Sequence, residues 1–142
     1  MKDNIICSGA LFYTTNTKRF LFLQRTDSKT QGMWGLVGGK SKFTESAFEG
    51  LKREIKEEVG DTPRFKKVIP LEMFTSNDEK FFFHTYLIAI ETEFLPNLND
   101  EHSGYCWCAF ECWPKNLHMG LKNTLNNKAI KGKLQTILDL IT

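Results

Sequence analysis

Residues 39–61, GKSKFTESAFEGLKREIKEEVGD, carry the strongest structural signals of the chain. It predicts a helix over residues 47–59. Ser46 and Glu49 have the spacing of a capping box at its start, and Gly60 supplies the stop at its end. With helical spacing the apolar residues form a single stripe that a core would bury, made up of Phe48, Leu51, Ile55 and Val59.

Three carboxylates share one edge of this helix. With Glu54 taken as zero, Glu58 lies at about +40° and Glu57 at about −60° around the axis. Like charges at this spacing repel each other, and a hard divalent cation bound through oxygen ligands would compensate them. The competing interpretation is an ordinary solvated helix in which glutamates pair with lysines.

Small residues lie on the same edge, upstream of the carboxylates: Ala47 and Gly50. A glycine inside a helix costs about 1 kcal/mol relative to alanine, so Gly50 needs a reason. Either open space for a metal and its ligand or close packing against the sheet would supply one.

Composition is typical of one globular domain spanning residues 1–142, with 41% hydrophobic and 25% charged residues. A net charge of +2 argues against binding to a nucleic acid polymer. Residues 1–16 lack the pattern of a secretory signal, and the apolar run 81–90 has about half the length of a membrane span. We therefore expect a soluble, cytoplasmic protein that does not use a membrane.

Four cysteines raise the question of zinc, because three of them form a C-x-C-x3-C cluster: Cys7, Cys106, Cys108 and Cys112. Zinc sites usually contain C-x2–4-C pairs instead. The favoured interpretation is buried, reduced cysteines with a packing role. A zinc-stabilised interaction module built on the last three is the alternative.

The remaining pattern predicts strands at 5–13, 19–25, 64–74, 80–90 and 105–110, and a short apolar piece at 33–37 runs into the pair Gly38 and Gly39. Helical spacing of apolar residues predicts an amphipathic helix at the C-terminal end, whereas residues 116–127 are ambiguous between loop and short helix. Gly9 indicates a bulge or a close backbone approach, and Gly38 with Gly39 indicates a turn or a close approach to a ligand. The fold class is an α/β (α+β) sandwich with a mixed β-sheet between helices.

The pattern G39-x5-E45-x7-R53-E54-I55-x-E57-E58-x-G60 resembles the signature of the Nudix hydrolases. It covers residues 39–61 and departs from the family at Asp61, where an aliphatic residue is expected. Residues 33–40, MWGLVGGK, resemble the family's entry into the motif, although Val37 stands where proline is more frequent. Residues 100–102, Asp-Glu-His, resemble a region in which many members carry a further acidic ligand or base.

The resemblance implies a role for each motif residue. Glu54, Glu57 and Glu58 would bind Mg²⁺ or Mn²⁺ together with the backbone carbonyl of Gly39. Arg53 would orient a glutamate, either Glu45 or Glu54. Glu101 would be an extra ligand or the general base, Gly60 would be structural, and the substrate-binding candidates are Arg25, Trp34, Gly38 and Gly39.

The resemblance also implies the reaction, which is hydrolysis of a nucleoside diphosphate linked to another moiety by attack of water on phosphorus. Among small-molecule nucleotide substrates we favour an ADP-ribose-like nucleotide sugar or a dinucleoside polyphosphate. One alternative is a pyrophosphohydrolase that removes oxidised nucleoside triphosphates, and another is a non-catalytic nucleotide-binding regulatory domain. A homodimer is possible. Arg25 would meet a phosphate, whereas Trp34 could stack on a base or belong to the core.

Overall fold

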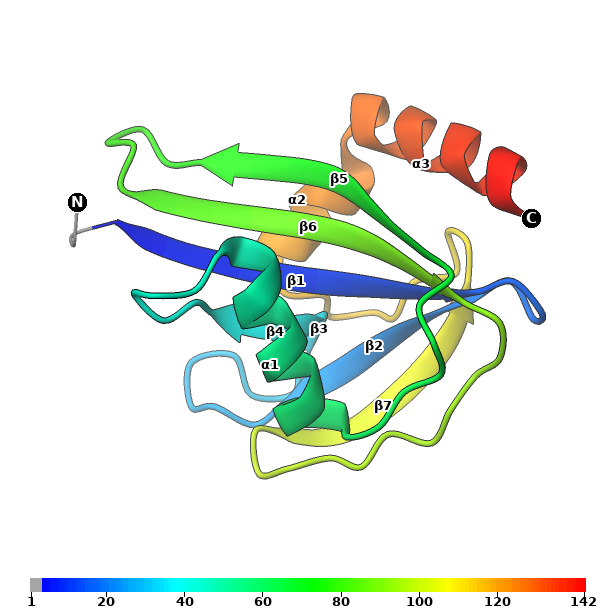
Figure 1. Cartoon of the computed structure of the whole chain (residues 1–142), viewed down its shortest axis with the longest axis horizontal. Helices are drawn as coiled ribbons and strands as arrows, with labels where there is room; N and C mark the ends of the chain where they lie inside the picture. The colour runs from blue at the N-terminus through cyan, green and yellow to red at the C-terminus, as the bar shows by residue number, and fades with distance from the viewer. Residues whose placement is uncertain (1–3) are drawn as a thin grey trace.

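A seven-stranded mixed sheet and three helices make up the computed structural model, which describes residues 4–142 (Figure 1). The helices are α1 (Ala47–Val59), α2 (Met119–Asn126) and α3 (Lys128–Ile141). The strands are β1 (Ile5–Thr14), β2 (Arg19–Arg25), β3 (Trp34–Gly35), β4 (Val37–Lys40), β5 (Lys67–Thr75), β6 (Phe81–Ile90) and β7 (His102–Ala109). Within this part of the chain no helix is long and apolar enough to cross a membrane.

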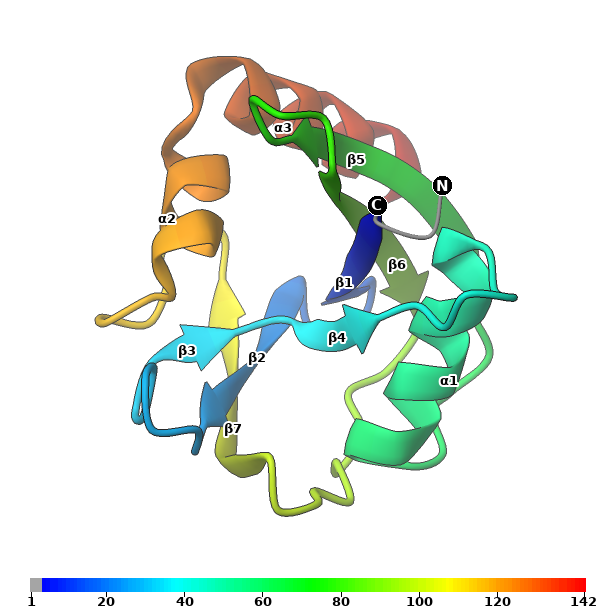
Figure 2. The ribbon, with the colours of Figure 1, turned by 90° about the vertical axis from the view of Figure 1, so that its left-hand side faces the viewer.

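Strand β1 lies at the centre of the sheet. It runs parallel to β6 from the pair Ile5↔Phe81 to the pair Thr14↔Ile90. Two strands share the other edge of β1. Strand β4 pairs with residues 7–10 and β2 pairs at Tyr13, and both pairings are antiparallel. The main path is β3-β2-β1-β6-β5, and β7 pairs with β2. The shared edge brings β4, which leads into α1, against the middle of the sheet (Figure 2).

Two apolar clusters fill the two faces of the sheet. Alternation along β1 sends Ala10 and Phe12 into the cluster with α1, and Leu11 and Tyr13 into the cluster with α2 and α3. Figure 2 shows α1 and α2 on opposite sides of the central strands. The expected sandwich, a mixed sheet between helices, is confirmed.

Several element boundaries differ from the sequence prediction. The short apolar piece at 33–37 contains β3 and the first residue of β4, and the glycine pair lies inside β4 rather than in a turn. Residues 116–127 contain α2. Gly9 forms no bulge, and instead Leu36 and Phe83 lie 3.1 Å from the position that a Cβ atom would take there.

Gly50 is explained by close packing and not by open space. A Cβ atom at this position would overlap the Oγ of Ser41 and would lie 3.0 Å from the Ser41 Cα. Ser41 Oγ also donates to the carbonyl of Ser46, the N-cap residue of α1. The expectation of room for a metal at Gly50 is therefore wrong, and the packing partner is the loop before α1 rather than the sheet.

We expect Gly50→Ala to lower the free energy of unfolding by about 1–3 kcal/mol, because the clash with Ser41 exceeds the gain in helix propensity. Gly132→Ala in α3 is the matched control, since no atom lies within 4 Å of its would-be Cβ. That variant should gain up to about 1 kcal/mol. Urea unfolding of both variants checks the pair, and a stabilised Gly50→Ala protein would contradict the packing.

Candidate active site

Two glycines of β4 allow close approaches, Gly38 to β1 and Gly39 to α1. A Cβ atom on Gly38 would overlap the backbone carbonyl of Ser8 on β1, and a Cβ atom on Gly39 would lie 2.5 Å from Glu54 Oε2. Neither glycine has a positive φ, so the missing side chain is what matters here. The Glu54 carboxylate consequently rests against the backbone of β4.

Glu58 is the most buried carboxylate of the helix, with only 2% of the residue exposed. Its Oε1 accepts a hydrogen bond of 3.0 Å from the backbone N–H of Gly38. Burial raises the pKa of Glu58 to about 8, and the charges of Glu54 and Glu101 add to the rise. The Gly38 N–H and the positive charge of Arg25 act in the opposite direction without cancelling it.

Glu54 shares this environment one turn earlier. Its side chain is 14% exposed, and burial raises its pKa, as do the charges of Glu57 and Glu101. The positive charge of Arg53 lowers the pKa of Glu54 and so opposes this rise; its Nη1 lies 3.4 Å from Glu54 Oε2. Burial thus raises the pKa of both carboxylates, and the charge of Glu54 adds to the rise for Glu58, which a bound cation would relieve.

Arg53 holds the loop before α1 onto the helix. Its Nε and Nη2 donate to the two oxygens of Glu45, at 2.8 and 3.0 Å, and Nη2 also donates to the carbonyl of Lys40 at 3.0 Å. This pairing lowers the pKa of Glu45 to about 2 and raises that of Arg53. Of the two partners expected for Arg53, Glu45 is the bidentate one.

Glu57 is bound to the same arginine. Arg53 Nη1 donates to Glu57 Oε2 at 3.1 Å, and half of the Glu57 side chain is exposed. As they stand, no three His, Cys, Asp or Glu side chains among residues 4–142 gather closely enough to hold a metal ion. The donor set still fits a hard cation, because two carboxylates lie against the backbone of β4: Glu54 occupies the space that a Cβ on Gly39 would fill, and Glu58 accepts from the N–H of Gly38.

Glu101 lies at the turn before β7, where the loop 91–101 returns to α1. Asn99 connects the two, since its Nδ2 donates to the carbonyl of Glu57 and its Oδ1 accepts from the N–H of Glu101, both at 3.0 Å. The sequence reasoning missed Asn99, whose only signal was an asparagine-rich loop. The charge of Glu101 contributes to the raised pKa values of Glu54 and Glu58, and its role as a ligand or base stays a prediction.

Arg25 approaches the site from the end of β2, after a register shift at Gln24/Arg25. Its Nε donates to Asp27 and Thr30, at 3.1 and 2.7 Å. Its terminal nitrogens donate to no acceptor within residues 4–142, so they are available to a ligand. Trp34 instead packs against the cluster with α2 and α3. The ligand roles of Arg25 and Trp34 stay predictions.

The cysteines do not form a three-ligand group in the part of the chain that is described. Cys106 and Cys108 lie with their Sγ atoms 3.5 Å apart and pack against the cluster with α2 and α3, whereas Cys112 is exposed. Burial and the neighbouring thiol raise the pKa of Cys106 to about 12. This environment fits reduced packing residues, and it gives the zinc alternative no support.

His102 is a buried histidine that the sequence reasoning mentioned only as part of a motif. It is 9% exposed, and its Nδ1 has no hydrogen-bond partner among the described residues. Burial lowers its pKa to about 4, with a further lowering by Arg25 and a small opposing effect of Asp27. The imidazole is therefore neutral in the folded protein at neutral pH.

This burial predicts a pH dependence of stability. An unfolded His102 takes up a proton near pH 6.5, whereas the folded one resists until about pH 4, so stability present above pH 6.5 is lost as the pH falls to 4. The loss amounts to roughly 3 kcal/mol. We expect the free energy of unfolding of His102→Gln, measured with urea, to fall less between pH 6.5 and pH 4 than that of the wild type. Parallel pH profiles of the two proteins would disprove the assignment.

Comparison with known proteins fits this geometry. The model of the NUDIX domain family matches residues 6–127. None of the curated proteins compared with the chain matches it.

Solved structures resemble the whole fold. A MutT Nudix hydrolase from Burkholderia pseudomallei is 25% identical, with a TM-score of 0.69 over 87% of this chain and 96% of its own. A MutT protein from Methanosarcina mazei is 24% identical (TM-score 0.71; 93% and 96% covered), and a C. elegans Ap4A hydrolase is 19% identical (0.69; 92% and 97%). With the family model covering most of its length, the chain belongs to the NUDIX family and is a Nudix hydrolase.

Proposed function

We propose that this protein hydrolyses a nucleoside diphosphate linked to another moiety, by attack of water on phosphorus, with Mg²⁺ or Mn²⁺ as the cofactor. The observation that carries the proposal is the pair Glu54 and Glu58. Both carboxylates are desolvated and close to each other, and the buried one has only a backbone N–H as a direct partner. A divalent cation compensates such a pair and also recruits phosphate oxygens.

The carboxylates of Glu54 and Glu58 would hold the cation, together with the carbonyl of Gly39. Glu57 would complete the set by exchanging Arg53 for the metal, which its half-exposed side chain permits. The bound cation supplies neutralisation of phosphate charge and a lowered pKa for water.

Other residues of the chain act on the substrate and the water. Glu101 acts through its charge on the carboxylates of the proposed metal site and is the candidate to accept the proton of the attacking water. Arg25 offers its free terminal nitrogens to a phosphate. Arg53 keeps the loop with Glu45 in place through its fork of hydrogen bonds, so its role is positioning.

We expect Glu57→Gln and Glu58→Gln each to lower kcat at least about a hundredfold, because the metal loses a negative ligand. Both variants should remain folded, since an amide oxygen can still accept from Gly38 or Arg53. Glu79→Gln, in the exposed turn between β5 and β6, is the control and should keep full activity. Steady-state hydrolysis of a panel of nucleotide anhydrides, with the products identified, measures the effect.

The metal can be tested separately from turnover. Added Mg²⁺ or Mn²⁺ should raise the Tm of the wild type, because a ligand that binds only the folded state stabilises it. The Glu58→Gln variant should show a much smaller shift.

Hydrolysis in ¹⁸O-labelled water should place the label on a phosphate product. Near wild-type activity of either glutamine variant would refute the metal site. Metal-dependent nucleotide binding without turnover would point to the non-catalytic regulatory domain.

A further inference from the structure

Arg25 is held at only one of its three guanidinium nitrogens. Its Nε donates to Asp27 and Thr30, at 3.1 and 2.7 Å, whereas Nη1 and Nη2 donate to no acceptor in the part of the chain that is described. The side chain lies across β3, where Nη1 is 3.8 Å from the position that a Cβ on Gly35 would take. Burial raises the pKa of Glu58 and the charge of Arg25 lowers it, so the guanidinium is close enough to act on the proposed metal site.

His102 is the neighbour of Arg25 across the sheet. The two residues are register partners in the antiparallel pair of β2 and β7, so their side chains start on the same face with Cβ atoms about 4.5–5.5 Å apart. His102 is 9% exposed, and its Nδ1 is buried without a hydrogen-bond partner among the described residues. Burial lowers the pKa of this imidazole, and the charge of Arg25 lowers it further. A buried polar atom without a partner thus lies beside a guanidinium with unused N–H groups.

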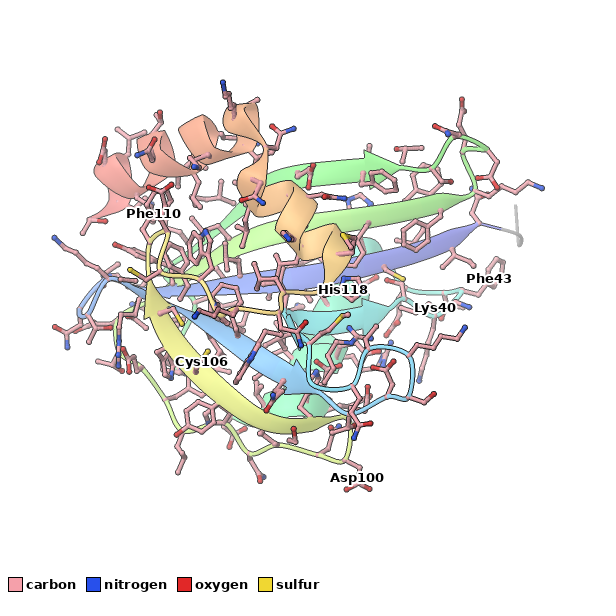
Figure 3. The ribbon with its side chains drawn as sticks, turned by 180° about the vertical axis from the view of Figure 1, so that it is seen from behind. Lys40, Phe43, Asp100, Cys106, Phe110 and His118 are labelled. Carbon is pink, nitrogen blue, oxygen red and sulfur yellow. The ribbon has the colours of Figure 1, made fainter. Side chains whose placement is uncertain are left out.

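A second histidine near Arg25 already has a partner for its Nδ1. His118, at the start of α2, has its pKa lowered by burial and also by the charge of Arg25. In Figure 3 the end of β2 lies between His118 and Asp100, which precedes β7. The Nδ1 of His118 accepts the backbone N–H of Gly120 at 3.2 Å and so caps α2. Of the two imidazoles that the charge of Arg25 affects, His102 is therefore the one that can accept from it through Nδ1.

The tautomer of His102 follows from its surroundings. A neutral imidazole carries one proton, and a guanidinium can only donate. A proton on Nδ1 would leave a buried N–H without an acceptor, next to the positive charge of Arg25. Nε2 is not among the buried atoms that lack a partner, so a proton there can be accepted, and the lone pair is left on Nδ1. The buried nitrogen is therefore a hydrogen-bond acceptor.

We propose that His102 is a positioning residue for the hydrolysis: in the complex with substrate, its Nδ1 accepts a hydrogen bond from a terminal N–H of Arg25 and so turns the remaining N–H groups toward a phosphate. Asp27 and Thr30 hold Nε, and this bond would hold a second edge of the same planar group. A guanidinium held at two points presents its other donors in a fixed direction, which lowers the cost of ordering it on an anion. The inference rests on the proposed function and adds to it a residue that does not itself touch the substrate.

Three substitutions at His102 separate this role from a packing role. Asparagine places its Oδ1 close to where Nδ1 stands, glutamine places its Oε1 near the position of Nε2, and leucine has no acceptor. We expect His102→Leu and His102→Gln to raise KM for a nucleotide anhydride about tenfold with kcat changed by less than about twofold, because the phosphate is charged in both the ground and the transition state. His102→Asn should keep KM within about threefold of the wild type. His84→Leu, at a half-buried histidine of β6, is the matched control and should change neither constant.

A double-mutant cycle tests whether His102 acts through Arg25. Arg25→Ala removes the donor, so adding His102→Leu to it should raise KM by less than about twofold, compared with about tenfold in the wild type. Effects of the two substitutions that simply multiply would show that His102 acts independently, and would overturn the inference. Equal KM values for His102→Asn and His102→Leu would overturn it as well. The Tm of each variant, measured in parallel, identifies any that does not fold.

The tautomer can also be read on the wild-type protein without turnover. Two-bond ¹H–¹⁵N NMR spectra at neutral pH should show the proton of His102 on Nε2 and none on Nδ1. Inorganic pyrophosphate with Mg²⁺ should shift the Nδ1 resonance of the wild type but not that of Arg25→Ala. If no anhydride is hydrolysed, the proposed function fails, and these spectra alone decide the contact between His102 and Arg25, as they do if the His102 variants do not fold. A proton on Nδ1, or a Nδ1 resonance that responds equally with and without Arg25, would refute the contact.

Discussion

Close packing on both sides of β4 sets the geometry of the carboxylates. On one side, a Cβ at Gly38 would overlap the carbonyl of Ser8 on β1. On the other, a Cβ at Gly39 would overlap Glu54 of α1, and a Cβ at Gly50 of α1 would overlap Ser41 of the following loop. The same contact sets the distance between the backbone of β4 and the carboxylates of α1. The packing around β4 therefore contributes both to the stability of the fold and to the position of the carboxylates. A substitution that loosens this packing would also move the carboxylates.

Burial divides four glutamates in and before α1 into two kinds. Glu45 and Glu57 are satisfied by Arg53, and the pKa of Glu45 is held near 2. Glu54 and Glu58 are desolvated, and their pKa values are raised. The environments differ because Glu45 and Glu57 accept hydrogen bonds from the guanidinium of Arg53, whereas Glu54 and Glu58 lie against the backbone of β4. Glu45, paired with Arg53, holds the loop before α1, whereas Glu54 and Glu58 are suited to binding a cation.

Features that depend on local chain chemistry were predictable. The limits of α1 follow from its period, its capping box and Gly60, and the structure has all three. Strand β4 was missed because it owes its existence to pairing with β1 and not to the propensity of its glycines. Asn99 was missed because its bond to Glu57 spans 42 positions. The family resemblance supplied Arg53 and Glu45 as partners, whereas the neighbour of Arg25 across the sheet is set only when β2 pairs with β7.

The parallel pairing of β1 with β6 has a consequence for how the molecule folds. Residues 5–14 must find residues 81–90, whereas β2, β4 and α1 lie much nearer to β1 in the sequence. Closing this long loop costs entropy before the new contacts repay it, so it should limit the folding rate more than helix formation does. Until β6 arrives, one edge of the apolar β1 is open to other chains. The strand that centres the native sheet is thus the segment most exposed to misassembly while the protein is being made.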